Sequence, residues 1–483
     1  MADLHDLTAV EQATAVRHGE VSAIELVEHY LARIEAHGRT VGAFITVTAD
    51  AARAQAKAVD AARAAEPEGL PPLAGVPTAI KDLTMTAGVR TTFGSAAFSD
   101  FVPEVDADVV GLLRAAGTIS LGKTTTSELG CSLYSEGAVA LPARNPWGLE
   151  FTAGGSSGGA AAAVAAGLVP VAQGSDGGGS LRIPAAICGL VGYKPSRGLV
   201  SGGPLGFGAF GLPTNGPIAR TVADAAALLD AMAVPVPGEP YPFPPVPADG
   251  FLAAARRAEP GRLRVGRFTT PMLAEVSVDP ACLAAVDTMA AALAGAGHDV
   301  VEAPAPFGPE HTPMFETLWY ALALSPVPPE REEELLPLTR WLRERGAAIG
   351  AVGLMNALTG LQVAVREALR ALLRFDLLLS PTLAAPQAAV GWFTATGHPA
   401  EDFERQKRFS PYCAYYNVTG QPAVSLPVGS TSDGMPVGAM LVGRLGEDET
   451  VLAAAAQLEQ GMAWHERHPA IWRAAHSATV NGV

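Results

Sequence analysis

Apolar residues in the first part of the chain recur at the three- and four-residue spacing of a helix. The clearest run consists of Ile24, Leu26, Val27, Tyr30, Leu31 and Ile34. Two segments, Thr8–Glu11 and Ser22–Glu25, also fit the capping box, in which a hydroxyl and a carboxylate satisfy free backbone N–H groups where a helix begins. The pattern predicts N-terminal helices within residues 1–65.

Beyond residue 70, short apolar runs alternate with helical stretches. These runs are Val76–Ile80, Val109–Ala116, Thr118–Leu121, Val169–Ala172 and Gly189–Val191. Such alternation is typical of an α/β fold, in which helices cover the faces of a sheet. Strand-like segments return late in the chain, at Leu377–Thr382 and Ala423–Val428.

Between these strand-bearing regions, residues 235–247 are rich in proline and residues 311–374 read as mainly helical. Because strand-like segments lie on both sides, we predict one sheet assembled from distant parts of the chain. The predicted fold is a single large α/β domain over residues 1–483, an α/β/α sandwich around a mixed multi-stranded sheet. Its parts are N-terminal helices at 1–65, a core at 70–230, a largely helical insert at 235–375 and a C-terminal return to the sheet at 376–475.

Composition excludes one class of protein and disfavours another. The chain has 483 residues, of which 49% are hydrophobic and 17% charged, with a mean hydropathy of +0.23. Intrinsic disorder requires low hydrophobicity and high charge, so it is excluded. A net charge of −15 and a pI of about 5.1 disfavour binding to a phosphate backbone, and we expect no nucleic-acid partner.

The longest tract without charge, Phe151–Ser175, has 25 residues and is long enough to span a bilayer. It consists mostly of glycine, alanine and serine, so we interpret it as buried backbone and expect no membrane association. The N-terminus carries acids and lacks an apolar stretch, so no secretory signal is expected. The four cysteines, Cys131, Cys188, Cys282 and Cys413, form no CxxC pair, which favours a reduced cytoplasmic protein without structural zinc.

Two glycine-rich stretches, Gly154–Ala160 and Gly174–Pro184, are hard to explain by packing. Glycine costs conformational entropy, so such clusters indicate positive φ angles or close approach of the backbone to a ligand. A P-loop is excluded because no lysine follows either cluster, and the dinucleotide fingerprint is not completed by the run that ends at Ser180.

Two hydrolase motifs match parts of the chain. Gly154-x-Ser156-x-Gly158 fits the nucleophile elbow of α/β-hydrolases, but the segment RNPWGLEFTA precedes it instead of a buried apolar strand. Ser120 to Lys123 fits the S-x-x-K pattern of β-lactamases, which has only four residues and low specificity.

The chain has five lysines: Lys57, Lys81, Lys123, Lys194 and Lys407. Arginine does not deprotonate in proteins, so any basic side chain acting as a proton acceptor would have to come from this small set or from a histidine. Lys81 follows the apolar run Leu73–Ile80 and is placed at the end of a predicted buried strand. Burial there would favour its neutral form, whereas a strand-end lysine reaching solvent is the alternative.

The segments GVPTAIK ending at Lys81, GGSSGG around Ser156, and DGGGSLRIPAAICGLVGYKPSRG around Ser180 together resemble the amidase signature family. Ser156 and Ser180 are 24 positions apart, as the paired serines of that family are. Further similar segments are Arg144–Trp147, Gly216–Arg220 and Tyr416–Pro422, and the resemblance covers about residues 5–230 and 375–460. Gly177 stands where many members carry threonine or isoleucine. The resulting sequence Gly-Gly-Gly-Ser is similar to that of the branch which contains cyclic oligoamide hydrolases.

The resemblance implies a catalytic triad, with Ser180 as the nucleophile, Ser156 as a bridging serine in a cis peptide bond and Lys81 as the base. It also implies an oxyanion hole formed by the backbone N–H groups of Ser180 and of Gly177, Gly178 and Gly179.

More peripheral roles follow from the same resemblance and its surroundings. Gly130 aligns with a position whose carbonyl faces substrate, and Cys131 is a candidate for the pocket wall; a turn glycine and a buried hydrophobe are the alternatives. Asp176 and Arg182 are expected to fix the loop that carries the nucleophile. Four side chains of the insert either roof the pocket or pack in the core: Trp319, Tyr320, Trp341 and Met355.

The resemblance implies an amide hydrolase acting on linear or cyclic small-molecule amides through an acyl-enzyme, with esters and carbamates as side substrates. No cofactor is implied, and the ten histidines show no metal-binding spacing. The resemblance also implies a homodimer, which is typical of the family. Two alternatives stay open, an ammonia-delivering amidotransferase subunit of the same fold and an amidase-like binding scaffold without turnover.

Overall fold

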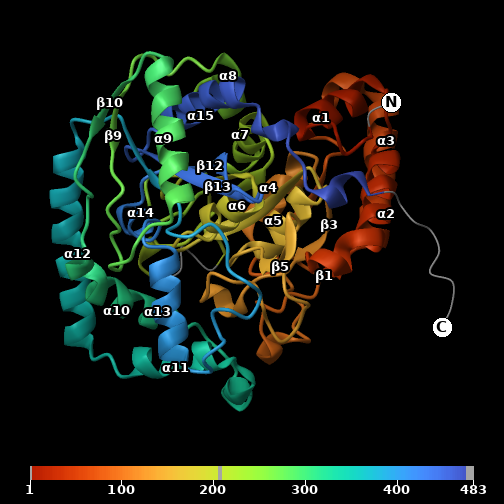
Figure 1. Ribbon diagram of the computed structural model, residues 1–483. Helices are drawn as coiled ribbons and strands as arrows, with labels where there is room; N and C mark the ends of the chain where they lie inside the picture. The colour runs from red at the N-terminus through yellow and green to blue at the C-terminus, as the bar shows by residue number, and fades with distance from the viewer. Residues whose placement is uncertain (1–2, 205–208, 475–483) are drawn as a thin grey trace.

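A computed structural model describes residues 3–204 and 209–474 of the protein. The predicted domain limits at residues 1 and 483, and the end of the C-terminal segment at 475, lie outside these residues. Figure 1 shows a central sheet with helices on both faces, helices α1–α3 at one end of the molecule and α10–α12 at the other. The predicted α/β class with one large mixed sheet is confirmed.

The main sheet has eleven strands in the order β1-β3-β2-β6-β8-β7-β12-β13-β11-β9-β10. Four neighbouring pairs are parallel, namely β2–β3, β2–β6, β9–β11 and β9–β10, and the others are antiparallel. Its strands are β1 (Phe44–Val47), β2 (Pro77–Lys81), β3 (Ile119–Thr124), β6 (Val171–Asp176), β7 (Val191–Lys194), β8 (Thr214–Ala219), β9 (Arg264–Arg267), β10 (Asp299–Glu302), β11 (Leu377–Pro381), β12 (Ala423–Ser430) and β13 (Pro436–Gly443). A small second sheet pairs β4 (Arg144–Asn145) with β5 (Gly148–Thr152).

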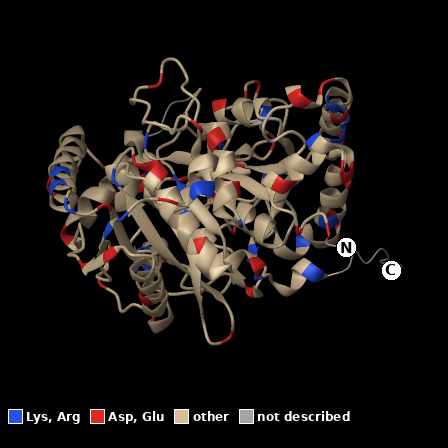
Figure 2. Ribbon diagram, turned by 90° about the horizontal axis from the view of Figure 1, so that it is seen from above, with Lys and Arg blue, Asp and Glu red and all other residues tan. Residues whose placement is uncertain are grey.

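The helices form a layer on each face of the main sheet. One hydrophobic core joins the sheet to α4 (Asp108–Ala115), α7 (Val222–Met232), α8 (Phe251–Arg257), α9 (Pro280–Gly295) and α15 (Asp448–Met462). The other core joins the opposite face to α2 (Ala23–Val41), α3 (Ala49–Ala65), α5 (Gly158–Ala165), α6 (Arg182–Cys188), α10 (Thr312–Leu322), α11 (Pro337–Ala347), α12 (Ala351–Leu372), α13 (Pro399–Phe409) and α14 (Tyr415–Thr419). Helix α1 (Ala9–His18) packs near α7. Charged residues of both signs are mixed over the outer helices (Figure 2).

Both predicted capping boxes are present. The hydroxyl of Thr8 accepts from the backbone N–H of Glu11 at the start of α1, and that of Ser22 accepts from Glu25 at the start of α2, while each carboxylate bonds back. One part of the expectation for residues 1–65 is wrong, because Phe44–Val47 forms edge strand β1 between α2 and α3. This segment, FITV, consists of aromatic and β-branched residues, which favour strands, and it pairs antiparallel with β3.

Four of the five apolar runs of the core overlap strands β2, β3, β6 and β7, although Gly189–Val191 reaches β7 only at its last residue. The fifth, Val109–Ala116, forms helix α4, because its buried residues Val109, Val110 and Leu113 have helical spacing. The insert at 235–375 is helical from α10 to α12, and it also supplies strands β9 and β10 at one edge of the sheet.

Within residues 3–204 and 209–474, no single helix is long and apolar enough to cross a membrane. Helices α11 and α12, which meet at an angle of 99°, reach that length and composition only when taken together.

Candidate active site

Lys81 is the last residue of β2, and the strand beside it is β6, which runs parallel to it. Because the carboxyl ends of parallel strands meet at the same edge of a sheet, Lys81 lies next to the end of β6. Its backbone N–H donates to Oε1 of Gln173 at 3.0 Å, and its Nζ lies 3.0 Å from Oγ and 3.2 Å from the carbonyl oxygen of Ser175. The sheet register therefore fixes where the amine points.

Ser156 lies in the loop before α5, and the Gly155–Ser156 peptide bond is cis, as the resemblance implies. A hydrogen bond of 2.7 Å joins its Oγ to Lys81 Nζ. The hydroxyls of Thr126 and Ser135 donate to the Ser156 carbonyl oxygen at 2.8 Å and 3.2 Å. These contacts hold the Ser156 hydroxyl against the amine.

Burial changes the protonation of Lys81. The side chain is 0% exposed, and this burial lowers its pKa from the usual value to about 7, against a smaller opposing effect of the Asp176 charge. A buried amine loses hydration in its charged form, so the neutral form is populated near neutral pH. Lys81 can therefore accept a proton there.

Ser180 lies between β6 and α6, and it is 6% exposed. It lines a cavity of about 60 Å³ together with Cys131 and Gly178. Its carbonyl oxygen accepts from the N–H of Ser157 at 3.3 Å, which ties its loop to the start of α5. The Ser180 hydroxyl makes no hydrogen bond with any residue that the structure describes, so it is free to face a ligand in the cavity.

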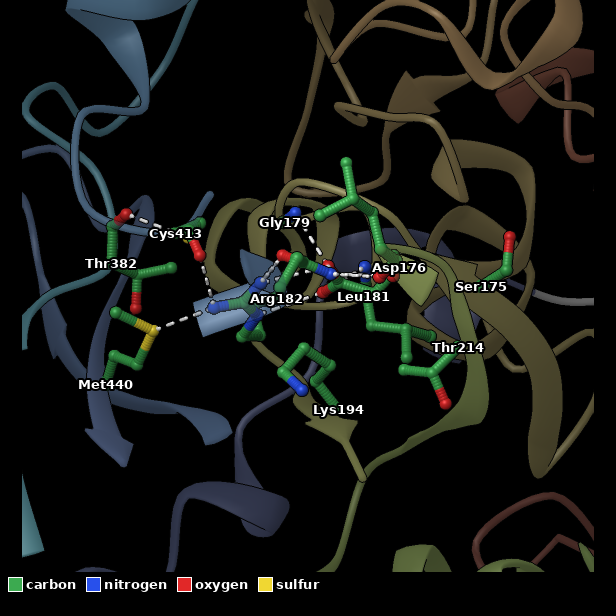
Figure 3. Close-up of polar contacts among 12 residues, drawn as sticks. Ser175, Asp176, Gly179, Leu181, Arg182, Lys194, Thr214, Thr382, Cys413 and Met440 are labelled. Carbon is green, nitrogen blue, oxygen red and sulfur yellow. Dashed lines mark hydrogen bonds and ion pairs between the residues drawn. The ribbon is translucent and has the colours of Figure 1, made fainter. Parts of the chain in front are cut away.

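A buried ion pair holds the Ser180 loop. The Arg182 guanidinium donates to both carboxylate oxygens of Asp176 at 2.9 Å, and both side chains are fully buried. Burial alone would raise the pKa of Asp176, but the charge and hydrogen bonds of Arg182 lower it well below its usual range. Figure 3 shows this pair at the centre of the network, with the Ser175 side chain directed away from it. The loop-fixing role expected for Asp176 and Arg182 agrees with these contacts.

The expected oxyanion donors divide into two groups. Among the described residues, the backbone N–H groups of Gly177, Gly178 and Ser180 find no acceptor, so they remain available to a substrate carbonyl. The N–H of Gly179 instead donates to Asp176 at 2.7 Å, so the expectation that it forms part of the oxyanion hole is wrong. Gly179 has a φ of +127°, and a Cβ there would lie 2.7 Å from Cys413, so this position requires glycine for its conformation and space.

Comparison with known proteins identifies the family. The Amidase family model matches residues 25–452. An amidase of Synechocystis sp. is 38% identical over 95% of this chain and 89% of its own length, and the 6-aminohexanoate-cyclic-dimer hydrolase of Paenarthrobacter ureafaciens is 36% identical over 95% and 96%. The solved structure of a 6-aminohexanoate cyclic dimer hydrolase with its substrate has a TM-score of 0.88 and 31% identity, covering 98% of this chain and 100% of that one. The chain belongs to the amidase family.

Membership confirms the resemblance found in the sequence and assigns hydrolysis of amide C–N bonds to this amidase. Among residues 3–204 and 209–474, no group of three or more His, Cys, Asp or Glu side chains is arranged to hold a metal ion. All four cysteines are buried free thiols.

The structure also places the more peripheral candidates. Cys131 lines the cavity, and burial raises the pKa of its thiol to about 12, so it is a neutral wall residue. Gly130 has a φ of +72°, and a Cβ there would lie 3.8 Å from Ser156 Oγ, which places it beside Ser156. Of the four insert side chains, Trp319 lines the cavity, whereas Met355 is 59% exposed and lies outside it.

Sequence reasoning missed two residues of the site. Ser175 contacts the amine of Lys81, and its position directly before Asp176 in the glycine-rich stretch was the available signal. Asn417 accepts from Arg182 at 2.7 Å and donates to the Asp176 carbonyl oxygen at 2.8 Å. Asn417 lies 241 positions from Asp176, so only the fold brings the two together.

Proposed function

We propose that this amidase cleaves small-molecule amides through an acyl-enzyme on Ser180, with Lys81 as the base and Ser156 as the bridge. Neutral Lys81 takes the proton of Ser156 Oγ while Ser156 takes that of Ser180 Oγ. Ser180 Oγ then bonds to the carbonyl carbon of the substrate. A serine hydroxyl needs such a neighbouring base because it is a weak nucleophile by itself.

The remaining steps use the same groups. The negative oxygen of the tetrahedral intermediate accepts hydrogen bonds from the N–H groups of Gly177, Gly178 and Ser180. When the C–N bond breaks, the proton returns from Lys81 through Ser156 to the leaving nitrogen. Water next attacks the ester carbon and gives a proton to Lys81 by the same route. The C–Oγ bond then breaks, Ser180 regains its proton, and a carboxylic acid is released.

One observation carries this proposal, the 2.7 Å hydrogen bond between the fully buried amine of Lys81 and Ser156 Oγ beside the Ser180 cavity. A buried lysine without a carboxylate in contact is costly as a cation, which suits a residue that must be neutral to act. The link from Ser156 to Ser180 is absent among the described residues, and we propose that substrate binding closes it, as catalytic hydrogen bonds often tighten only in the complex.

A labelling experiment tests the nucleophile. Mass spectrometry after treatment with a fluorophosphonate is expected to find one adduct, on Ser180, and the Ser180→Ala variant should lose both labelling and turnover. Ser120→Ala, which alters the S-x-x-K pattern, serves as the matched control and should retain both. An adduct on Ser156 or Ser157 would support the nucleophile elbow instead.

An assay of amide hydrolysis separates the alternative functions. An amidotransferase subunit needs partner subunits, and a binding scaffold gives no turnover. Steady hydrolysis of an amide by the purified lone chain excludes both. A product burst followed by no further turnover would contradict the proposed deacylation by water.

We also propose that the enzyme is cytoplasmic and a homodimer. Four buried free thiols suit a reducing compartment. Light scattering of the purified chain measures the assembly, and a monomer at micromolar concentration would refute the dimer.

A further inference from the structure

The walls of the Ser180 cavity are mostly apolar. They come from helices α6, α10 and α13 and from nearby loops, and include Leu133, Ile183, Phe315, Trp319 and Phe403, with Gln406 and Lys407 of α13 as polar members. The cavity has a volume of about 60 Å³. An apolar cavity of about 150 Å³ is known to hold one benzene molecule. The cavity of this amidase is smaller and opens to its surroundings, so it encloses only a few carbon atoms of a bound group.

Trp319 forms the wall next to the expected oxyanion loop. A Cβ built on Gly178 would lie 3.2 Å from Cζ3 and 3.3 Å from Cη2 of Trp319, and one on Gly177 would lie 3.9 Å from Cζ3. The six-membered ring of the indole thus packs against the backbone whose N–H groups face the substrate carbonyl. An acyl chain that extends from a carbonyl held there must pass along this ring.

Neighbouring side chains hold Trp319 in place. Its indole stacks on Phe315, with ring centroids 5.7 Å apart and planes 28° from parallel. Phe315 in turn packs against Tyr415. Trp319 is itself only 9% exposed and is backed by Phe315, so it has little freedom to move aside for a larger group, because close-packed interiors resist displacement.

An ion pair ties together the two helices that carry the aromatic walls. Lys407 of α13 pairs with Glu316 of α10, and the Lys407 side chain is only 9% exposed. Glu316 is three residues before Trp319, and Lys407 is four residues after Phe403. The ion pair therefore resists separation of α10 and α13 when a substrate occupies the cavity.

We propose that this amidase acts on amides with short apolar acyl groups, and that Trp319 sets the upper limit of acyl length. This inference rests on the proposed function, because the acyl group stays on Ser180 after the amine has left, and Ser180 lines the cavity. The amine must depart before water attacks, so the confined space suits the acyl side of the substrate. Trp319 is thus a specificity-determining residue.

The test is a series of p-nitroanilides with acetyl, butyryl, hexanoyl, octanoyl and benzoyl groups and a constant leaving group. For the natural enzyme, kcat/KM should rise by about fourfold per methylene while the chain still fits. It should then fall at least tenfold before octanoyl and stay low for benzoyl. Trp319→Leu should move the fall to longer chains and raise benzoyl turnover at least tenfold.

The control is Trp392→Leu, which removes a tryptophan that is 42% exposed and lies outside the cavity. Its length profile should match that of the natural enzyme. Trp319→Phe, which keeps an aromatic wall, should give an intermediate profile if Trp319→Leu fails to fold, as judged by its melting temperature.

Three results would overturn the inference: a profile that stays high through octanoyl and benzoyl, Trp319 variants with the profile of Trp392→Leu, or a length limit along a series of amines with none along the acyl series. Each of these leaves the proposed function standing, because turnover that depends on Ser180 is still observed. Absence of turnover for every anilide, together with no labelling of Ser180, would instead refute the proposed function and this inference with it.

Discussion

At the scale of single residues, one buried lysine differs from two others in the groups that its amine contacts. Lys81, Lys123 and Lys194 are all buried, and burial lowers the pKa of each. Lys123 donates to the Thr84 carbonyl oxygen at 2.6 Å and lies 3.6 Å from a carboxylate oxygen of Asp82, and Lys194 donates to a backbone carbonyl. Among the described residues, Lys81 is the one whose amine contacts Ser156. Its surroundings, more than its burial, therefore distinguish it.

The first prediction concerns pH. Because burial lowers the pKa of Lys81 to about 7 and the base must be neutral, activity should rise as pH increases through 7 and level off in mild alkali. Lys81→Arg keeps the positive charge but has no neutral form, so it should be inactive across the range. Measurement of kcat/KM from pH 5 to 9.5 checks both expectations. A rate that falls from pH 6 to 8 while the circular dichroism stays native would contradict the role of Lys81.

The second prediction concerns Ser156. If this hydroxyl relays the proton, Ser156→Ala should lower kcat by about 10²- to 10⁴-fold, the usual range for a lost acid–base group. Ser135→Ala removes the hydrogen bond to the Ser156 carbonyl oxygen and the one that Ser135 Oγ accepts from the N–H of Gly158, but it leaves the hydroxyl of Ser156 in place, so it should cost about 1–3 kcal/mol of stability and little activity. Rates and urea unfolding of both variants make the comparison. Equal, small losses of activity in the two would show that Ser156 only supports the loop.

At the scale of elements, the turn between β6 and α6 depends on one ion pair. Arg182→Gln would leave the carboxylate of Asp176 buried and uncompensated, which should lower the free energy of unfolding by about 3–5 kcal/mol. The N–H of Gly179 also bonds to that carboxylate, so the Ser180 loop should lose its shape and kcat should fall.

The control for this third prediction is Arg257→Gln. Arg257 pairs with Asp249 and Glu449 at the surface, with its side chain 45% exposed, so its removal should cost much less stability than that of Arg182. Urea unfolding monitored by fluorescence gives both values. Similar costs for the two arginine variants would contradict the claim that the buried pair holds the loop.

The elements also show what the sequence can predict. The capping boxes at Thr8 and Ser22 are local, so their side chains and spacing were enough to predict where α1 and α2 begin. The motif residues Lys81, Ser156 and Ser180 were recognised because their segments resemble a family. The partner of Gly179 was not predictable, because whether its N–H faces the substrate or Asp176 depends on the turn geometry. Strands β9 and β10 were missed because each has only four residues in a helix-rich segment.

At the scale of the whole molecule, the two ends of the described chain meet. One ring nitrogen of His5 lies 3.0 Å from the Trp472 carbonyl oxygen, and the other lies 3.0 Å from a ring nitrogen of His29. His468 stacks on Trp472 with ring centroids 4.1 Å apart, and the guanidinium of Arg220 lies 4.5 Å from the same indole. This cluster fastens the C-terminal segment to the N-terminal helices.

The cluster should make the stability of the folded protein sensitive to acid. Burial, with a further contribution from Arg33, lowers the pKa of His5 to about 4, and burial with Arg220 does the same for His468. Each folded pKa lies below the unfolded value of about 6.5, so the fold favours neutral rings. Their contribution to stability is therefore complete above about pH 6.5 and is lost as pH falls towards 4.

A double variant isolates this effect from other groups that titrate in acid. His5→Asn keeps a hydrogen-bonding side chain, and His468→Phe keeps a ring on Trp472, but neither takes up a proton. Calorimetry from pH 7 to 4 should show a smaller fall in melting temperature for the double variant than for the natural protein. His18→Asn, at a side chain 60% exposed, should leave the fall unchanged. If the double variant lost stability as steeply as the natural protein, the acid response would have to come from the buried carboxylates, and the histidine cluster would be a packing contact alone.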